Sequence, residues 1–449
     1  MPAMNDTIRK PHRHFTSFQV IILGFFSVIL LGSLLLMLPF ATRDGQGASF
    51  ADGLFTATSA VCVTGLIVHD TATYWSEFGQ AIILTLIQIG GMGVVTIAVA
   101  IAVASGRKIG LMQRSTMQEA ISAHQVGGIV RLTKFILKTS ILIELVGAVI
   151  LSPVFCKDFG ILKGIWYSVF HSISAFCNAG FDLIGIREQY SSLTTYAVNP
   201  VINLTIMALI ITGGLGFVTW ADMQKNKLHF RKYTMQSKVI LTVTAVLLTL
   251  PAIYFFFCEF ADLPLGKRFL SSLFQSVTPR TAGFNTVDLT LISETGLLLM
   301  IILMLIGGSP GSTAGGMKTT TIAVLFSSAL SVFRKQDSAH FFGRRIPDSS
   351  VKNAATILLM YITLFLGGGM VISYIEEVPL VSALFETSSA IGTVGLSLGL
   401  TPTLGMISRI ILIILMFWGR VGGLTLIFAT LSERNTFGSR YPQEKITVG

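Results

Sequence analysis

Towards its C-terminal end the chain reads Ser388-Ser389-Ala390-Ile391-Gly392-Thr393-Val394-Gly395-Leu396, a pattern that occurs three more times. The other copies read Thr58-Ser59-Ala60-Val61-Cys62-Val63-Thr64-Gly65-Leu66, Ile173-Ser174-Ala175-Phe176-Cys177-Asn178-Ala179-Gly180-Phe181 and Ser276-Val277-Thr278-Pro279-Arg280-Thr281-Ala282-Gly283-Phe284. Each copy has a small or hydroxyl-bearing lead-in, then a glycine, then a large apolar residue. Successive glycines lie 115, 103 and 112 residues apart, which indicates four copies of one unit.

A second glycine-rich marker follows each copy, 25, 33, 24 and 24 residues after its glycine. The markers read Gly90-Gly91-Met92-Gly93, Gly213-Gly214-Leu215-Gly216, Gly307-Gly308-Ser309-Pro310-Gly311 and Gly419-Arg420-Val421-Gly422. Two markers that recur in the same order strengthen the prediction of a fourfold repeat. We interpret most glycines of the second marker as positions of close helix packing.

The composition indicates a membrane protein, because 52% of the residues are hydrophobic and only 12% are charged. Soluble domains carry about 25% charged residues. Eight stretches are long and apolar enough to cross a bilayer: 17–40, 78–104, 131–155, 198–222, 236–258, 295–333, 353–375 and 405–432. A shorter apolar segment between the members of each pair is typical of a re-entrant pore loop.

The predicted fold is therefore an all-α polytopic membrane protein in which four covalently linked helix–pore loop–helix repeats surround a pseudo-fourfold pore. It has eight membrane helices and four re-entrant loops. The expected repeats span 17–106, 131–223, 235–334 and 351–432. Basic linkers at 107–130 and 224–234, a third linker at 335–350, and tails at 1–16 and 433–449 complete the chain.

The charge distribution predicts the orientation. Of the 32 basic residues, 23 lie in segments that face one side of the predicted membrane, so both termini are expected in the cytoplasm. The net charge of +10 is thereby explained by topology, and no nucleic-acid partner is expected. Fourteen of the 22 acidic residues lie on the opposite side, where they are either ordinary solvated charges or a negative mouth that concentrates cations.

The first marker suits a filter for dehydrated cations. Such a filter needs a ring of backbone carbonyl oxygens from several chain segments, and glycine allows the positive φ angles that aim successive carbonyls at one axis. The alternative is that these glycines serve helix packing. The candidate filter residues are Cys62, Val63, Thr64, Gly65, Cys177, Asn178, Ala179, Gly180, Arg280, Thr281, Ala282, Gly283, Gly392, Thr393, Val394 and Gly395.

These motifs resemble a known family. Thr393-Val394-Gly395-Leu396 is similar to the filter of potassium channels, and Thr281-Ala282-Gly283-Phe284-Asn285 with the segment 307–318 is similar to the Trk/Ktr/HKT superfamily of potassium transporters, closest to the Ktr-type membrane subunit of a bacterial uptake system. The resemblance implies a homodimer in the bacterial plasma membrane and a cytosolic ring of nucleotide-binding regulatory subunits. K⁺ in the pore is the one metal expected. No covalent cofactor is expected, and strict exclusion of Na⁺ does not follow.

The sixth span is interrupted by a stretch too rich in glycine and proline for a regular helix. At membrane depth such a segment must line a cavity. We interpret it as a gate below the filter, an interpretation that the family resemblance also supports; a static kink is the alternative. The candidate gate residues are Gly307, Gly308, Ser309, Pro310, Gly311, Ser312, Thr313, Ala314, Gly315, Gly316, Lys318 and Arg420.

Three ionisable residues within the expected membrane region remain to be explained, because such residues are rare and usually functional. Arg420 replaces a marker glycine and is expected either to hold the gate or to bind carbonyls at a helix break. Arg280 is expected to point away from the ion path towards a Glu or Asp. Glu144 either pairs with a basic residue or faces an interface.

No residue pattern suggests an enzyme. The segment 311–319 resembles a phosphate-binding loop, but Met317 separates its last glycine from Lys318. The four cysteines are interpreted as small apolar residues. Besides a gated channel-like pathway, two alternatives remain: a Na⁺- or H⁺-coupled symporter, and a scaffold or sensor that transports nothing.

Overall fold

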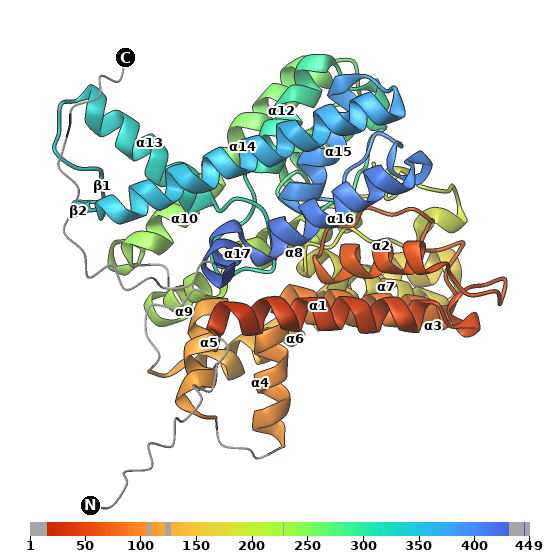
Figure 1. The fold of residues 1–449 in the computed structure, drawn as a ribbon. Coiled ribbons are helices and arrows are strands. Elements are labelled where there is room, and N and C mark those ends of the chain that lie inside the picture. The colour runs from red at the N-terminus through yellow and green to blue at the C-terminus, as the bar shows by residue number, and fades with distance from the viewer. Residues whose placement is uncertain (1–15, 106–108, 122–126, 228, 431–443, 445–449) are drawn as a thin grey trace, which may run out of the picture.

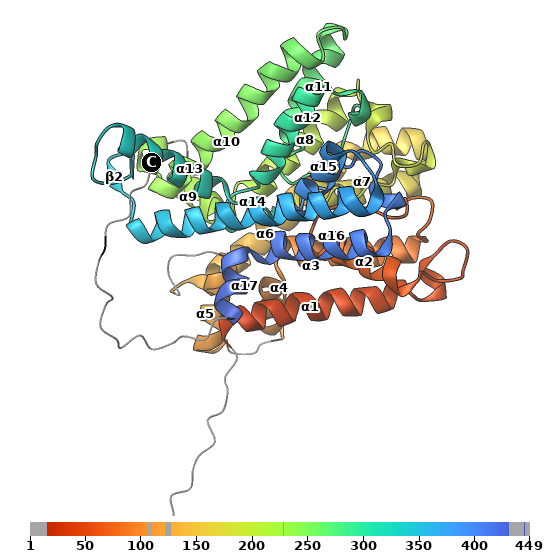
Figure 2. The ribbon, with the colours of Figure 1, turned by 45° about the horizontal axis from the view of Figure 1, so that its top comes forward.

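The computed structural model describes residues 16–105, 109–121, 127–227 and 229–430 together with residue 444. The predicted tails at 1–16 and 433–449 lie almost entirely outside the described residues, as do two parts of the linker 107–130. The long helices α1 (Ser17–Leu36), α14 (Asp348–Glu376) and α16 (Met406–Val421) lie roughly along one axis in both views, and α16 runs opposite to the other two (Figures 1 and 2).

Within the described residues, four uninterrupted helices are long and apolar enough to cross a membrane. They are α1 (Ser17–Leu36), α6 (Ile129–Phe159), α10 (Met235–Tyr254) and α14 (Asp348–Glu376). A π-helical turn, Phe255–Glu259, extends α10. Large apolar side chains on these helices are exposed, for example Leu31 and Val149, as expected for surfaces that face lipid.

Each of the other four expected spans is broken, which corrects the prediction of continuous helices at 78–104, 198–222 and 405–432. The second span is α3 (Glu77–Met92) and α4 (Val94–Ala104), bent by 94°. The fourth is α8 (Pro200–Gly214) and α9 (Phe217–Asn226), bent by 96°. The eighth is α16 (Met406–Val421) and α17 (Gly423–Thr430), while the sixth is α12 (Glu294–Leu305) and α13 (Thr319–Phe333) on either side of 306–318.

A single glycine makes each of the three bends. Gly93, Gly216 and Gly422 have φ angles of 85°, 91° and 90°. This backbone conformation cannot continue a right-handed helix and is strained for any residue with a Cβ atom. The last glycine of the second marker therefore breaks the helix, a role that the packing interpretation did not include.

Four short helices fill the segments between the paired spans: α2 (Phe50–Val61), α7 (Ile161–Phe176), α11 (Leu265–Val277) and α15 (Leu380–Gly392). Each ends at a copy of the first marker. Their C-terminal halves are largely buried, and one phenylalanine in each helix is fully inaccessible: Phe55, Phe170, Phe274 and Phe385. The helices thus point their partially negative C-termini into the centre of the protein.

The short helices and the broken helices pack in a closed cycle. α3 packs on α7, α8 on α11, α12 on α15, and α16 returns to α2. The second long element of each unit therefore contacts the short helix of the next unit, and the last unit contacts the first. The four copies of the first marker are held around one axis by this arrangement.

The remaining elements lie outside this cycle. Helix α5 (Leu111–Ile121) packs on α1 and α4. Strands β1 (His340–Phe341) and β2 (Arg344–Arg345) form a small antiparallel hairpin within the linker 335–350, a minor departure from the all-α prediction. Short 3₁₀ turns occur at Pro39–Ala41, Ile184–Ile186, Thr194–Tyr196, Phe230–Lys232, Leu289–Leu291 and Thr401–Thr403.

Candidate functional site

The four marker glycines lie in a closed ring. A methyl group placed on Gly65 would lie 2.4 Å from the carbonyl oxygen of Ala179, and one on Gly180 would lie 2.7 Å from that of Ala282. A methyl group on Gly283 would lie 2.3 Å from the Val394 oxygen, and one on Gly395 would lie 2.2 Å from the Thr64 oxygen. Each glycine thus faces the backbone of the next loop, and no larger residue fits at these four positions.

The backbone of each loop alternates in conformation. Val63, Asn178, Thr281 and Thr393 have positive φ angles of 51° to 64°, and the glycines two residues later have φ angles of 71° to 92°. Alternation between the left- and right-handed regions turns successive carbonyls to the same side of an extended strand. Three of these residues are β-branched, for which a positive φ is strained by about 1–3 kcal/mol. Strain at four equivalent positions indicates a functional site.

Hydroxyl groups of the lead-in segments hold the loops in this conformation. The Gly65 amide donates to Ser59 Oγ (3.1 Å), and the Gly395 amide donates to Ser389 Oγ (3.0 Å). Ser174 Oγ donates to the Phe181 oxygen (2.7 Å), and Thr278 Oγ1 donates to the Phe284 oxygen. The sequence predicted no role for these four residues, although the hydroxyl-rich lead-in was the signal that could have identified them.

Three threonine side chains in the ring lack protein partners. The Oγ1 atoms of Thr64, Thr281 and Thr393 are buried and accept or donate no hydrogen bond within the described residues. An unsatisfied buried hydroxyl costs about 1–3 kcal/mol. A hydrated or partly hydrated cation moving through the ring would satisfy such oxygens, so these residues fit a cation as cargo.

The residues that begin the four loops differ more than the glycines. Cys62, Cys177, Arg280 and Gly392 occupy equivalent positions at the ends of the short helices. Arg280 is 5% exposed, and its Nη2 donates to Thr244 Oγ1 (3.3 Å), so the predicted carboxylate partner is wrong. Its Nε has no partner.

The interrupted sixth span is wound against the broken fourth span. The amides of Ser309 and Thr313 donate to the Gly214 and Gly213 oxygens (3.0 and 3.3 Å), because those glycines expose their backbone. The Phe217 amide donates in return to the Gly311 oxygen (2.6 Å). The segment is thus folded through specific backbone contacts, which differs from a simple kink in a helix.

The same segment touches two loops of the ring directly. Thr313 Oγ1 donates to the Phe176 oxygen (3.0 Å) and to Asn178 Oδ1 (2.9 Å) in the second loop. A methyl group on Gly315 would lie 2.2 Å from Thr393 Oγ1 in the fourth loop. The predicted gate residues therefore lie immediately beside the predicted filter residues.

Arg420 joins this segment to the helix break of the first unit. Its Nη1 donates to the Thr313 oxygen and its Nη2 to the Gly90 and Gly91 oxygens. Lys318 Nζ donates to the Ala314 and Gly315 oxygens (2.9 and 3.2 Å). Arg420 thus binds carbonyls at a helix break and within the segment 307–316, and its role in a gate stays a prediction.

A cavity of about 320 Å³ lies on the side of this segment away from the ring. Arg420, Lys318 and residues of the helix breaks at Gly93 and Gly422 line it, and Glu119 of α5 contributes a carboxylate. A methyl group on Gly311 would lie 2.2 Å from the Ile121 oxygen, so α5 also touches the segment.

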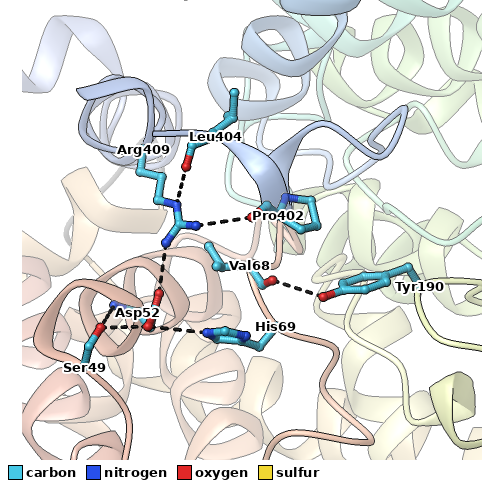
Figure 3. Close-up of polar contacts among 8 residues, drawn as sticks. All are labelled: Ser49, Asp52, Val68, His69, Tyr190, Pro402, Leu404 and Arg409. Atoms are coloured by element: carbon cyan, nitrogen blue, oxygen red, sulfur yellow. Dashed lines mark hydrogen bonds and ion pairs between the residues drawn. The ribbon is translucent and has the colours of Figure 1, made fainter. Parts of the chain in front are cut away.

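An ion pair joins the last unit to the first at the other end of the ring (Figure 3). Arg409 Nη1 donates to Asp52 Oδ1 (3.0 Å), and its remaining donors bind the Leu404 and Pro402 oxygens (2.9 and 3.2 Å). His69 Nε2 lies 3.4 Å from Asp52 Oδ2. Arg409 and Asp52 are 357 positions apart in sequence, and no sequence pattern connects them.

Acidic groups surround the loop exits nearby. Tyr190 donates its hydroxyl to the Val68 oxygen (3.2 Å; Figure 3). Its amide donates to Asp70 Oδ2 (3.1 Å), and both bonds join the first and second units. Burial, together with the negative charge of Asp70, raises the pKa of Asp182 to about 7. The negative mouth stays a prediction, and Asp182 on this side of the ring carries its full charge only above neutral pH.

Comparisons with known proteins give matches over nearly the whole chain. A family model described as "TrkH: Cation transport protein" matches residues 2–437. The chain is 42% identical to the potassium/sodium uptake protein NtpJ of Enterococcus hirae and 39% identical to the Ktr system potassium uptake protein B of Bacillus subtilis, with 100% of each chain covered in both pairs. The crystal structure of the potassium transporter TrkH from Vibrio parahaemolyticus has the same fold, with a TM-score of 0.74 at 20% identity over 94% of this chain and 86% of that one.

Proposed function

Since this chain belongs to the TrkH family of cation transport proteins, we propose that it is the membrane subunit of a potassium uptake system, with a channel-like, gated pathway for K⁺ and to some extent Na⁺. The family consists of transport proteins, so the expectation that the chain is not an enzyme is confirmed. The multi-pass membrane character expected from the composition agrees with both the family and the apolar helices.

The observation that carries the proposal is the closed ring of four loops. Gly65, Gly180, Gly283 and Gly395 each face a carbonyl oxygen of the next loop, and the alternating backbone turns carbonyls to one side. A ring of carbonyls can replace the hydration shell of K⁺. In this proposal, four helix–pore loop–helix repeats, each with one continuous and one broken span, surround this pathway.

A gate formed by 307–316 and Arg420 is the second part of the proposal. The segment contacts the second and fourth loops, and the Arg420 guanidinium places a positive charge beside it. Segment and charge together oppose cation passage, so conduction requires that the segment move. The contacts of Thr313 and Arg420 are hydrogen bonds that can break without unfolding a helix.

The place of Glu144 supports a channel in this proposal over a proton-coupled symporter. A proton relay uses carboxylates or histidines along the pathway. Glu144 lies between α3, α6 and α7, outside the ring of loops, and it contacts no other acidic or histidine side chain within the described residues. Coupling to Na⁺ remains the alternative, and reversal of flux with the K⁺ gradient alone would argue against it.

The partners belong to the proposal as well. We propose a homodimer with one pathway in each protomer, both termini in the cytoplasm of a bacterium, and a cytosolic ring of regulatory subunits that binds the nucleotide. The Ktr system proteins that resemble this chain are named as parts of a system, which supports a separate regulatory component.

The test is K⁺ and Na⁺ flux into liposomes that contain the purified protein, with Gly283→Ser compared with wild type. Serine at Gly283 meets the Val394 oxygen at 2.3 Å, whereas Gly399 has a similar positive φ of 87° and open space around it. Gly399→Ser is therefore the matched control for backbone strain. We expect Gly283→Ser to reduce K⁺ flux, or its preference over Na⁺, by on the order of tenfold, since 1.4 kcal/mol of binding energy is a factor of ten.

If the two variants behave alike, the carbonyl filter is wrong. If wild type conducts no ion even after removal of the gate segment, a non-transporting sensor becomes the better interpretation.

A further inference from the structure

One buried carboxylate takes no part in the pathway described so far. Glu144 lies in the middle of α6 and is 6% exposed. Ionisable groups at such a depth are costly and are retained where they do something specific. Within the described residues, no basic side chain lies within ion-pair distance of it.

The groups around the Glu144 carboxylate are hydrogen-bond donors. Gln88 Nε2, from α3, lies 3.0 Å from Oε1 and 3.2 Å from Oε2. The Cys177 thiol lies 4.0 Å from Oε1 and 3.6 Å from Gln88 Oε1. Because an ionised carboxylate is an acceptor only, the Gln88 amide suits the charged form, whereas burial without a basic partner acts against it.

This cluster lies directly behind the second loop of the ring. Cys177 begins that loop, and a methyl group on Gly91 would lie 2.6 Å from its sulfur, so the thiol is held between α3 and α6. Ser172 of the short helix α7 donates to the Glu144 backbone oxygen (2.6 Å). The carboxylate of Glu144 therefore contacts the start of the loop, and its backbone oxygen is bonded to the helix that supports the loop.

The third loop has the opposite charge behind it. Arg280, at the position equivalent to Cys177, directs its buried guanidinium to Thr244 on α10. Its backbone oxygen in turn lies 3.4 Å from Asn178 Nδ2 of the second loop. Adjacent loops of one ring are thus backed by a negative and a positive group.

We propose that Glu144 is a specificity-determining residue that acts through Cys177 on the second loop. Its negative charge makes this side of the ring the favoured side for a cation, and its hold on Cys177 fixes the spacing of the loop carbonyls. The inference rests on the proposed function, since it assumes that ions pass through the ring. Charges at this range in a partly buried site change binding constants by roughly three- to tenfold.

The experiment measures K⁺ uptake into proteoliposomes over a range of K⁺ concentrations, and the K⁺ to Na⁺ flux ratio, for Glu144→Gln, Glu144→Asp and Cys177→Ala. Glu377→Gln, at the exposed end of α14, is the control for loss of one carboxylate. We expect Glu144→Gln to raise the K⁺ concentration for half-maximal uptake by roughly three- to tenfold. Glu144→Asp, which keeps the charge, should change it less, and Glu377→Gln should not change it.

A double-mutant cycle tests the route through Cys177. If Glu144 acts through the thiol, Cys177→Ala reproduces part of the shift, and the double variant shifts no more than Glu144→Gln alone. Full additivity of the two effects would overturn this route. If Glu144→Gln does not assemble, the K⁺ dependence of uptake is measured with Glu144→Asp and Cys177→Ala instead. The inference is overturned if both of these variants show the K⁺ dependence of wild type.

The result separates this inference from the proposed function. If Gly283→Ser abolishes the K⁺ preference and Glu144→Gln keeps wild-type affinity and selectivity, the filter stands and the role of Glu144 is wrong. If Gly283→Ser behaves like its Gly399→Ser control, the proposed filter is wrong, and so is the inference that rests on it.

Discussion

The breaks in the second helices form two kinds of structure. In the first, second and fourth units the break is one glycine, Gly93, Gly216 or Gly422, and a new helix begins at the next residue or shortly after. In the third unit thirteen residues, 306–318, separate α12 from α13. The four loops of the ring, by contrast, share their conformation closely.

This difference separates two tasks. A coordination ring requires equivalent contributions from every side, so the loops keep the same glycine and the same alternation of φ. A gate requires one element that can move while the others hold still. The third break supplies that element, and its contacts reach the second unit through Gly213 and Gly214 and the fourth through Arg420.

The largest expected change in K⁺ flux comes from removing the long break of the third unit, which the other three units lack. Deletion of residues 309–316 should raise K⁺ flux on the order of tenfold or more, because a gate that leaves the open state as a minor population restricts flux by that factor. Flux into liposomes at equal protein content is the measurement. The same deletion combined with Gly283→Ser should lose K⁺ preference, which shows that the added flux passes through the ring.

Unchanged flux in a well-folded deletion variant would mean that the segment is a static connection. Thr313→Val, which removes the bonds to Phe176 and Asn178, should act in the same direction with a smaller increase.

An intermediate effect is expected from Arg420→Gln. The variant loses the charge and weakens, without abolishing, the bonds to Thr313, Gly90 and Gly91. Flux should therefore rise roughly three- to tenfold, which corresponds to a loss of about 0.7–1.4 kcal/mol. Arg334→Gln, at the exposed end of α13, is the matched loss of one arginine. A fall in flux for Arg420→Gln alone would show that the arginine supports the open state.

The smallest effect compares two bends directly, with Gly216→Ala and Gly93→Ala. Each puts a Cβ atom on a glycine with positive φ and should cost about 1–3 kcal/mol of stability. At Gly93 the methyl group meets only Thr96 Oγ1 at 3.6 Å, but at Gly216 it lies 2.6 Å from the Pro310 oxygen. Gly216→Ala should therefore also alter flux by about twofold or more by displacing the gate segment. Equal flux in both variants would show that the Gly216–Pro310 contact does not hold the gate.

The sequence predicted the parts of this protein that repeat. The glycines of both markers, the interruption at 307–316 and the intramembrane Arg420 were all identified from spacing and composition. The right-angle bends were missed, because a glycine that packs closely and one that reverses the backbone look the same in sequence. Gly90 and Gly93 illustrate this, since only the first meets a neighbouring carbonyl, that of Val61 at 2.0 Å.

Contacts between distant segments were also beyond prediction from one sequence. Three contacts join residues from different units: the hydrogen bond of Thr313 to Asn178, the bonds of Gln88 to Glu144, and the ion pair of Asp52 with Arg409. Arg280 was placed correctly as pointing away from the loop, but its partner was predicted by charge alone, and burial beside Thr244 replaced the expected carboxylate.

The bond between Arg409 and Asp52 has a consequence for biosynthesis. Because the ring is built from a single chain, its first loop emerges early and must wait for the last unit before its neighbour α16 exists. Until then the strained backbone at Val63 has no partner on one side. A nascent or truncated chain that ends before Gly392 therefore holds only three of the four loops, and the ring stays open beside Val63. The ring can therefore close only after the last unit has been synthesised.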